Sequence, residues 1–184
     1  MDDNRVYLSF GRHGRYGINT AIEHTSMLEA YLGGVELRKT LPKCDAVYYS
    51  PIPRAAMTAK FRGLGLGCNH LLEKRELEED MSTFVIRSFI SNILQNSEES
   101  ERHYHFVTHQ PVLEKLGLPD LETCGICLCV ADSWEEMLAD NFEVVKLPNQ
   151  GGEKIHKLFN DLRIEADELE NFSPNGVYSA LSRL

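Results

Sequence analysis

The chain has 184 residues, of which 42% are hydrophobic and 26% charged, and its formal net charge is -9. This length suits a single domain over residues 1–184 and excludes two large ones. The negative charge argues against a broad nucleic-acid or anionic-membrane surface, since both need positive charge. No apolar run approaches the ~20 residues of a spanning helix, and the first residues lack a secretory signal. We therefore expect a cytoplasmic protein without a nucleic-acid or membrane partner.

Short apolar segments alternate with amphipathic ones along the chain. The strands that we expect are 5–10, 45–49, 69–72, 105–108, 124–131 and 142–147. The expected helices are one from about 28 or 34 to 41, then 52–61, 83–94 and 112–116, with a helical tail from about 152. Alternation of strands and helices predicts an α/β fold with a largely parallel sheet.

Glycine and proline set the expected helix limits. Gly33 and Gly34 leave the continuity of the first helix open, because glycine weakens a helix interior. Ser50 followed by Pro51 is typical of a helix start, with a hydroxyl cap and proline at the first position. Glycines at 63, 65 and 67 are expected to end this second helix.

The five cysteines suggest reduced thiols, because their number is odd and no export signal is present. Three of them cluster as Cys124, Cys127 and Cys129, a spacing that invites a zinc interpretation. No second Cys or His pair follows at finger-like distance, and the flanking residues are apolar. We therefore expect these thiols to pack in the core and no metal there.

Three strands are each followed by polar residues capable of chemistry. The first runs into Arg12-His13-Gly14, the second into Ser50 and Arg54, and the fourth into Thr108-His109. The carboxyl ends of parallel strands are where α/β proteins bind ligands. Two arginines, two histidines and a helix N-terminus together favour a phosphate site, and Gly14 allows close backbone approach to an anion.

Other interpretations of these residues remain open. His109 could be a strand-end histidine satisfied by a core hydrogen bond. Both histidines could ligate a divalent metal, although adjacent cationic arginines oppose this. A solvated Arg54 is less favourable, because a cation at a helix N-terminus opposes the helix dipole unless an anion is bound.

The three motifs resemble those of the histidine phosphatase superfamily, which includes the cofactor-dependent phosphoglycerate mutases and many small phosphatases. The resemblance rests on Arg12-His13-Gly14, on the stretch from Asp45 to Ala59, and on Val107 to Pro111, in the family's order and spacing. It implies a phosphoglycerate mutase-like fold, with helices on both faces of the sheet. We expect no cofactor for this chain.

The resemblance also assigns roles. His13 would be the nucleophile that becomes phosphohistidine, while Arg12, Arg54 and His109 would form the phosphate pocket. A histidine nitrogen can accept a phosphoryl group when neighbouring donors neutralise its oxygens, so the chemistry of these residues agrees.

The family's general acid is harder to assign. A carboxylate usually follows the third strand, and here that loop is strongly acidic. Glu76 best matches the usual position before an apolar residue, with Glu79 and Asp80 as alternatives. Most of this run would otherwise be a solvated loop.

The short segment after Arg15 suggests an open site with little cap, as in small phosphatases that resemble bacterial phosphohistidine phosphatases. We therefore expect a metal-independent phosphatase acting on protein phosphohistidine. The alternatives are a phosphomonoesterase acting on small phosphorylated metabolites, and a weakly catalytic phosphate-binding regulatory module.

Overall fold

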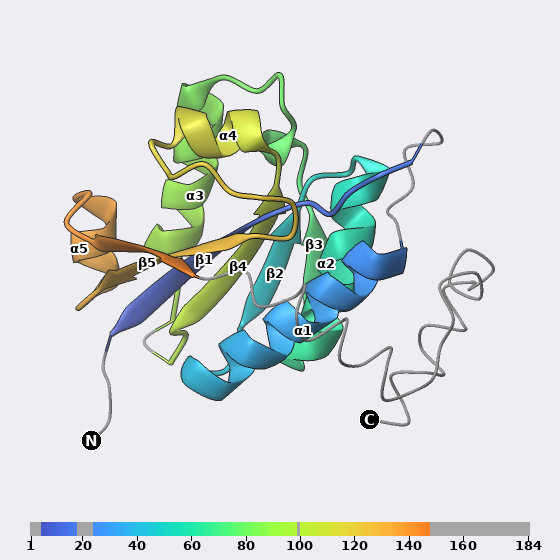
Figure 1. The fold of residues 1–184 in the computed structure, drawn as a ribbon. Coiled ribbons are helices and arrows are strands. Elements are labelled where there is room, and N and C mark those ends of the chain that lie inside the picture. The colour runs from blue at the N-terminus through green and yellow to red at the C-terminus, as the bar shows by residue number, and fades with distance from the viewer. Residues whose placement is uncertain (1–4, 18–23, 99, 148–184) are drawn as a thin grey trace.

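The fold is built around one six-stranded sheet, described here from a computed structural model that covers residues 5–17, 24–98 and 100–147 (Figure 1). The strand order is β3-β2-β4-β1-β5-β6. The strands are β1 (Val6–Arg12), β2 (Ala46–Tyr49), β3 (Leu71–Glu73), β4 (His103–Thr108), β5 (Ile126–Ala131) and β6 (Glu143–Leu147). The first four are mutually parallel, whereas β5 runs antiparallel to both β1 and β6. The prediction of a mostly parallel sheet is therefore confirmed.

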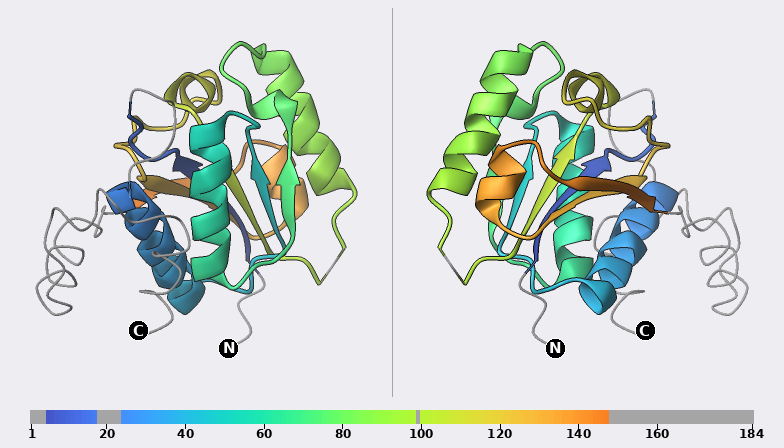
Figure 2. Two further views of the ribbon diagram at one scale, coloured as in Figure 1. Left: turned by 90° about the vertical axis from the view of Figure 1, so that its right-hand side faces the viewer. Right: turned by 90° about the vertical axis from the view of Figure 1, so that its left-hand side faces the viewer.

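Helices cover both faces of this sheet, as the resemblance implied (Figure 2). Helices α1 (His24–Thr40) and α2 (Pro53–Leu66) lie on one face, and α3 (Thr83–Gln95), α4 (Gln110–Lys115) and α5 (Trp134–Leu138) pack against the other. Side chains of β1 alternate accordingly, so Val6, Leu8 and Phe10 join the core under α3. None of the helices in the described ranges is long and apolar enough to cross a membrane.

Glycines inside α1 and α2 allow the two helices to pack closely against each other. A Cβ at Gly34 would lie 2.4 Å from the carbonyl oxygen of Arg62, and one at Gly65 would lie 2.1 Å from that of Tyr31. The two helices can approach this closely only because side chains are absent there. The expectation that α2 stops before its glycines was wrong, since it continues to Leu66 and ends at Gly67, whose φ is +70°.

Other elements also differ from expectation. Helix α1 begins at His24, ahead of the expected start. Helix α5 was not predicted from the sequence, although its capping residue was present. Ser133 Oγ accepts a hydrogen bond from the Glu136 amide at 3.2 Å. The short 3-10 turn η1 (Arg75–Leu77) lies within the acidic loop. The helical tail expected from residue 152 lies outside the described residues.

Candidate active site

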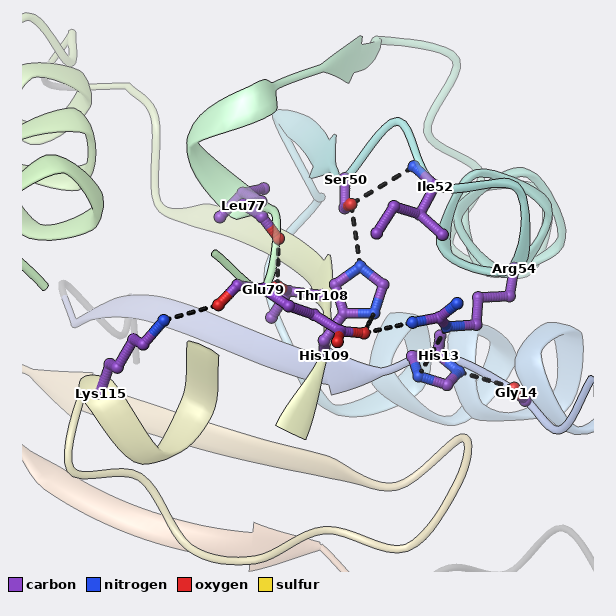
Figure 3. A network of polar contacts seen from close by, with 10 residues as sticks. All are labelled: His13, Gly14, Ser50, Ile52, Arg54, Leu77, Glu79, Thr108, His109 and Lys115. Atoms are coloured by element: carbon purple, nitrogen blue, oxygen red, sulfur yellow. Dashed lines mark hydrogen bonds and ion pairs between the residues drawn. The ribbon is translucent and has the colours of Figure 1, made fainter. Parts of the chain in front are cut away.

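The pairing register of three neighbouring strands brings their polar ends together. Arg12 of β1 pairs with Thr108 of β4, and Tyr49 of β2 pairs with Val107. The residues that follow these strands therefore emerge side by side at one edge of the sheet. They include His13 and His109, whose ring centroids lie 5.0 Å apart (Figure 3).

The ring of His13 is held in one tautomer. Its Nδ1 lies 2.7 Å from the carbonyl oxygen of Gly14, which can only accept, so Nδ1 carries the proton. Its Nε2 is left with a lone pair and accepts a hydrogen bond from Arg54 Nε at 3.1 Å. The backbone is fixed as well, because the His13 amide donates to the carbonyl of Thr108 at 3.0 Å.

The surroundings of His13 keep this ring neutral. Burial lowers the pKa of His13 below its usual 6.5, and the positive charges of Arg54 and Arg12 lower it further. The hydrogen bond to Gly14 and the charge of Glu79 act in the opposite direction but do not outweigh burial. His13 therefore presents an unprotonated nitrogen at neutral pH, as a nucleophile requires.

His109 faces both the core and the site. Its Nε2 lies 2.9 Å from Ser50 Oγ, and its Nδ1 lies 3.0 Å from Glu79 Oε1, outside hydrogen-bond alignment. Burial, followed by the charges of His13 and Arg54, lowers the pKa of His109 to about 3. The core hydrogen bond considered from the sequence thus exists, and it leaves the second ring nitrogen facing the site.

Arg54 is the second residue of α2, so the N-terminal end of this helix points at the site. Its guanidinium donates to His13 and forms an ion pair with Glu79 (Figure 3). The helix begins at Pro53, after an Ile52 N-cap without a side-chain cap, so the predicted start at Ser50 was wrong. The Ser50 hydroxyl accepts from the Ile52 amide at 3.4 Å and contacts His109 instead.

The acidic loop contributes Glu79 to the site. Leu77 is fully buried, and its carbonyl accepts from Thr108 Oγ1 at 2.8 Å. The backbone carbonyl of Glu79 accepts from Lys115 Nζ at 2.6 Å, so the loop is fixed on both sides of the carboxylate. Within the described ranges, Glu76 has no hydrogen bond or ion pair with either site histidine or with Arg54. The structure thus places Glu79, one of the two alternatives, beside Arg54 and His109.

The sequence carried a signal for where this loop is held, but none that selects Glu79 among its carboxylates. Leu77 is the lone aliphatic residue of the run between Leu72 and Met81, so it is the residue that anchors the loop in the core. A carboxylate close to that anchor is held near the sheet edge. Glu76 lies in the 3-10 turn before the anchor, whereas Glu79 follows it after the extended residue Glu78.

Arg12 and Gly14 contact the site less directly than the predicted phosphate pocket required. Arg12 Nη1 donates to the carbonyl of Leu121 at 2.6 Å and lies 4.0 Å from Asp120. Its buried Nε has no hydrogen-bond partner in the described part of the chain. The amide of Gly14 donates to Thr58 Oγ1 at 2.9 Å, so Gly14 contacts the site through its carbonyl and the ring of His13.

Tyr16 is a site residue that the sequence reading missed. Its ring lies 4.8 Å from the guanidinium carbon of Arg54 and 5.8 Å from the ring of His13. The side chain is 50% exposed, so it forms part of the rim. Nothing in the short segment after Arg15 singled out this tyrosine.

The same residues include a possible set of metal ligands. One ligand atom from each of His13, Glu79 and His109 lies within 4.8 Å of the others. The Arg54 guanidinium, however, contacts both His13 Nε2 and the Glu79 carboxylate. A divalent cation there would have to displace this fixed positive charge, so the cluster suits an anion better.

Comparisons with known proteins point to one fold. No protein-family model matches the chain, and no curated protein sequence matches it either. Among solved structures, the protein histidine phosphatase SixA complexed with tungstate is 16% identical and has a TM-score of 0.65, over 78% of this chain and 97% of that one.

Two further structures have the same architecture. A mycobacterial glucosyl-3-phosphoglycerate phosphatase is 11% identical with a TM-score of 0.55, over 77% of this chain and 97% of that one. The phosphoglycerate mutase of Plasmodium falciparum is 18% identical with a TM-score of 0.52, over 80% and 91%. The described chain therefore has the phosphoglycerate mutase-like fold that its three motifs predicted, the fold of the histidine phosphatase superfamily.

Proposed function

We propose that this chain is a metal-independent phosphatase in which His13 takes a phosphoryl group from the substrate and passes it to water. The observation that carries the proposal is the unprotonated Nε2 of His13, which lies beside the Arg54 guanidinium and the ring of His109. Transfer to a nitrogen needs a lone pair on the nucleophile and donors placed around the transferred oxygens.

The neighbouring residues take distinct roles in this proposal. Arg54 and the N-terminal end of α2 bind the phosphate, because charge-assisted hydrogen bonds are the stronger ones. His109 adds a donor: the Ser50 hydroxyl accepts from Ile52 and can donate to Nε2, which leaves the proton on Nδ1. Arg12 contributes charge and its unpartnered Nε. Gly14 acts as a positioning residue through its carbonyl.

We propose Glu79 as the general acid, in place of Glu76. In the free site its carboxylate pairs with Arg54 and approaches His109, where the oxygens of a phosphate would bind. An arriving phosphate competes for these partners and turns the carboxyl group toward the leaving oxygen. A proton delivered there helps alkoxide leaving groups most, because they leave poorly.

Protein phosphohistidine is the proposed substrate. The site has a half-exposed rim at Tyr16 and a short segment after Arg15, which suits a phosphorylated side chain presented by another protein. Among the proteins of similar fold, SixA is named as a protein histidine phosphatase. A small phosphorylated metabolite is the second candidate substrate. The similar fold of the glucosyl-3-phosphoglycerate phosphatase favours this candidate.

Acid-labile phosphate on the enzyme tests the mechanism. The chain is mixed briefly with labelled phosphohistidine peptide, an aryl phosphate or a sugar phosphate, in the presence of a chelator, and then denatured. We expect base-stable, acid-labile label on the peptide that contains His13, and none in His13→Asn. Label on a serine or aspartate, or turnover that stops with the chelator, would overturn the proposal. The substrate that labels fastest identifies the class.

A further inference from the structure

Two cysteines meet at the end of the β2–α2 unit that lies opposite the site. Cys44 precedes β2, and Cys68 directly follows Gly67, which ends α2. Since β2 and β3 are parallel, α2 must return the chain along the sheet, which brings its last residues back to the start of β2 (Figure 1). Both cysteines are free and buried in one apolar cluster, and a side-chain hydrogen bond joins their thiols.

The backbone holds both sulfurs in place. The Cys68 amide donates to the carbonyl of Gly63 at 2.9 Å, and the Gly67 amide donates to that of Leu64 at 3.2 Å, which closes the end of α2. The Cys44 sulfur lies 3.4 Å from the carbonyl oxygen of Ala46, and the Cys68 sulfur lies 3.8 Å from that of His70. The contact between the thiols is thus part of the folded framework.

The two thiols differ in reactivity. The hydrogen bond with Cys44, with smaller contributions from a backbone hydrogen bond with His70 and from the charge of His70, lowers the pKa of Cys68 to about 6 despite burial. The same hydrogen bond and burial raise the pKa of Cys44. Cys68 is therefore the more acidic of the two thiols.

The remaining cysteines provide an internal contrast. Burial raises the pKa of Cys124 and of Cys127 to about 12, and it also raises that of Cys129. All five cysteines of the sequence lie in the described ranges, and of these only Cys68 has a lowered pKa. Cys68 is 5% exposed but lies between the exposed residues Gly67 and Asn69, so a small oxidant has a short path to it.

We propose that Cys44 and Cys68 form a reversible disulfide when the protein meets a hydroperoxide. The Cys68 thiolate attacks one peroxide oxygen, and the oxygen–oxygen bond breaks to release hydroxide or alkoxide and leave a sulfenic acid. The Cys44 sulfur then attacks the Cys68 sulfur, and the sulfenic oxygen leaves as water with the Cys44 proton. Two thiols are oxidised to one disulfide, while the peroxide is reduced to water and an alcohol or a second water.

The disulfide would close a covalent loop around β2 and α2, which carry Ser50 and Arg54 at their other ends. A cross-link restricts the unfolded chain, so the thermal midpoint should rise by several degrees. This inference does not depend on the proposed phosphatase activity.

The test treats the reduced full-length chain with stoichiometric hydrogen peroxide, then blocks the remaining thiols and maps the peptides. We expect loss of two hydrogen atoms from the intact mass, a linked Cys44–Cys68 peptide and full reversal by dithiothreitol. Cys68 should react at least about tenfold faster than Cys127. In Cys44→Ser, a dimedone adduct should accumulate on Cys68, and Cys127→Ser is the matched control that should still form the disulfide.

Three results would overturn the proposal. They are oxidation of Cys124, Cys127 or Cys129 before Cys68, a stable sulfenic acid on Cys68 in the wild-type chain, and a thermal midpoint that the linked form leaves unchanged. The wild-type peptide map decides the first two even when a substituted chain folds poorly.

Discussion

Two pairs of histidines lie close together on this sheet, and only one pair has the neighbours of an active site. His13 and His109 follow the ends of β1 and β4, whereas His103 and His105 belong to β4 itself. All four side chains are at most 5% exposed. Burial is the largest cause of a lowered pKa in each, to about 3 for His109 and about 4 for His103.

The partners distinguish the two pairs. Ser9 Oγ lies 2.7 Å from His103 Nε2 and 2.7 Å from His105 Nδ1. A single hydroxyl therefore bridges the rings of His103 and His105, the inner pair. The rings of His13 and His109, the outer pair, instead contact the charged side chains of Arg54 and Glu79. Burial and a depressed pKa therefore do not mark a catalytic histidine by themselves. The outer pair is set apart by its position after the strand ends, where α/β proteins bind ligands, and by its direct contact with Arg54.

Removal of the proposed nucleophile, His13, should have the largest effect. His13→Asn should lower kcat by at least ~10⁴-fold, because no other side chain there presents an unprotonated nitrogen to a phosphate. His105→Asn is the matched control from the inner pair, and it should retain kcat while losing ~1–3 kcal/mol of stability. Steady-state kinetics and urea unfolding of both variants check this. Comparable loss of kcat in the two would erase the distinction between the pairs.

The proposed general acid, Glu79, provides the next test. Glu79→Gln should lower kcat on alkyl phosphates by ~10²–10⁴-fold and affect aryl phosphates and phosphohistidine far less. The same change removes a carboxylate that competes for Arg54, so vanadate or tungstate should bind more tightly. Glu76→Gln is the control from the same loop and should change neither quantity. If Glu76→Gln alone shows the leaving-group dependence, Glu76 is the acid after all.

Acid should destabilise the fold through the inner pair. The folded pKa of His103 is about 4, below the 6.5 of an unfolded histidine, so the unfolded chain binds more protons between these values. Stability is therefore complete above pH 6.5 and falls as the pH drops toward 4, by about 3 kcal/mol for His103.

Urea unfolding at pH 7 and pH 5 measures this dependence. His103→Asn should flatten the slope between the two values. An unchanged slope would mean that His103 does not titrate with folding. The activity of His13 should persist below pH 6.5, because the pKa of His13 is also lowered and its nucleophilic nitrogen stays unprotonated there.

The smallest expected effect concerns the rim. Tyr16→Ala removes a cation–π contact with Arg54, worth ~0.5–1 kcal/mol at an exposed site, so KM should rise by about two- to fivefold. Tyr16→Phe keeps the ring and should behave like the wild type. A loss in Tyr16→Phe as large as in Tyr16→Ala would assign the effect to the hydroxyl group instead.

The order of motifs along the chain was sufficient to predict the fold and to nominate His13, Arg54 and His109, because strands, their ends and their polar residues are local patterns. Glu79 was harder, since several carboxylates in one loop look alike. Its selection depends on the burial of Leu77 and on Thr108 and Lys115, which contact the loop from elsewhere in the chain.

Other features were decided only by tertiary contacts. The sequence could not show that Gly34 and Gly65 bring two helices together, because glycine favours a break and a close approach equally.

The sequence by itself thus determined the fold class, the strand ends and the chemical types of the groups placed there. The tertiary structure alone decided which carboxylate faces the histidines, which ring nitrogen is free, and which two of five cysteines touch. The physical reason is that helix and strand patterns depend on residues a few positions apart. Side-chain partners such as Ser9 with His103, or Cys44 with Cys68, are set by register and packing across distant segments.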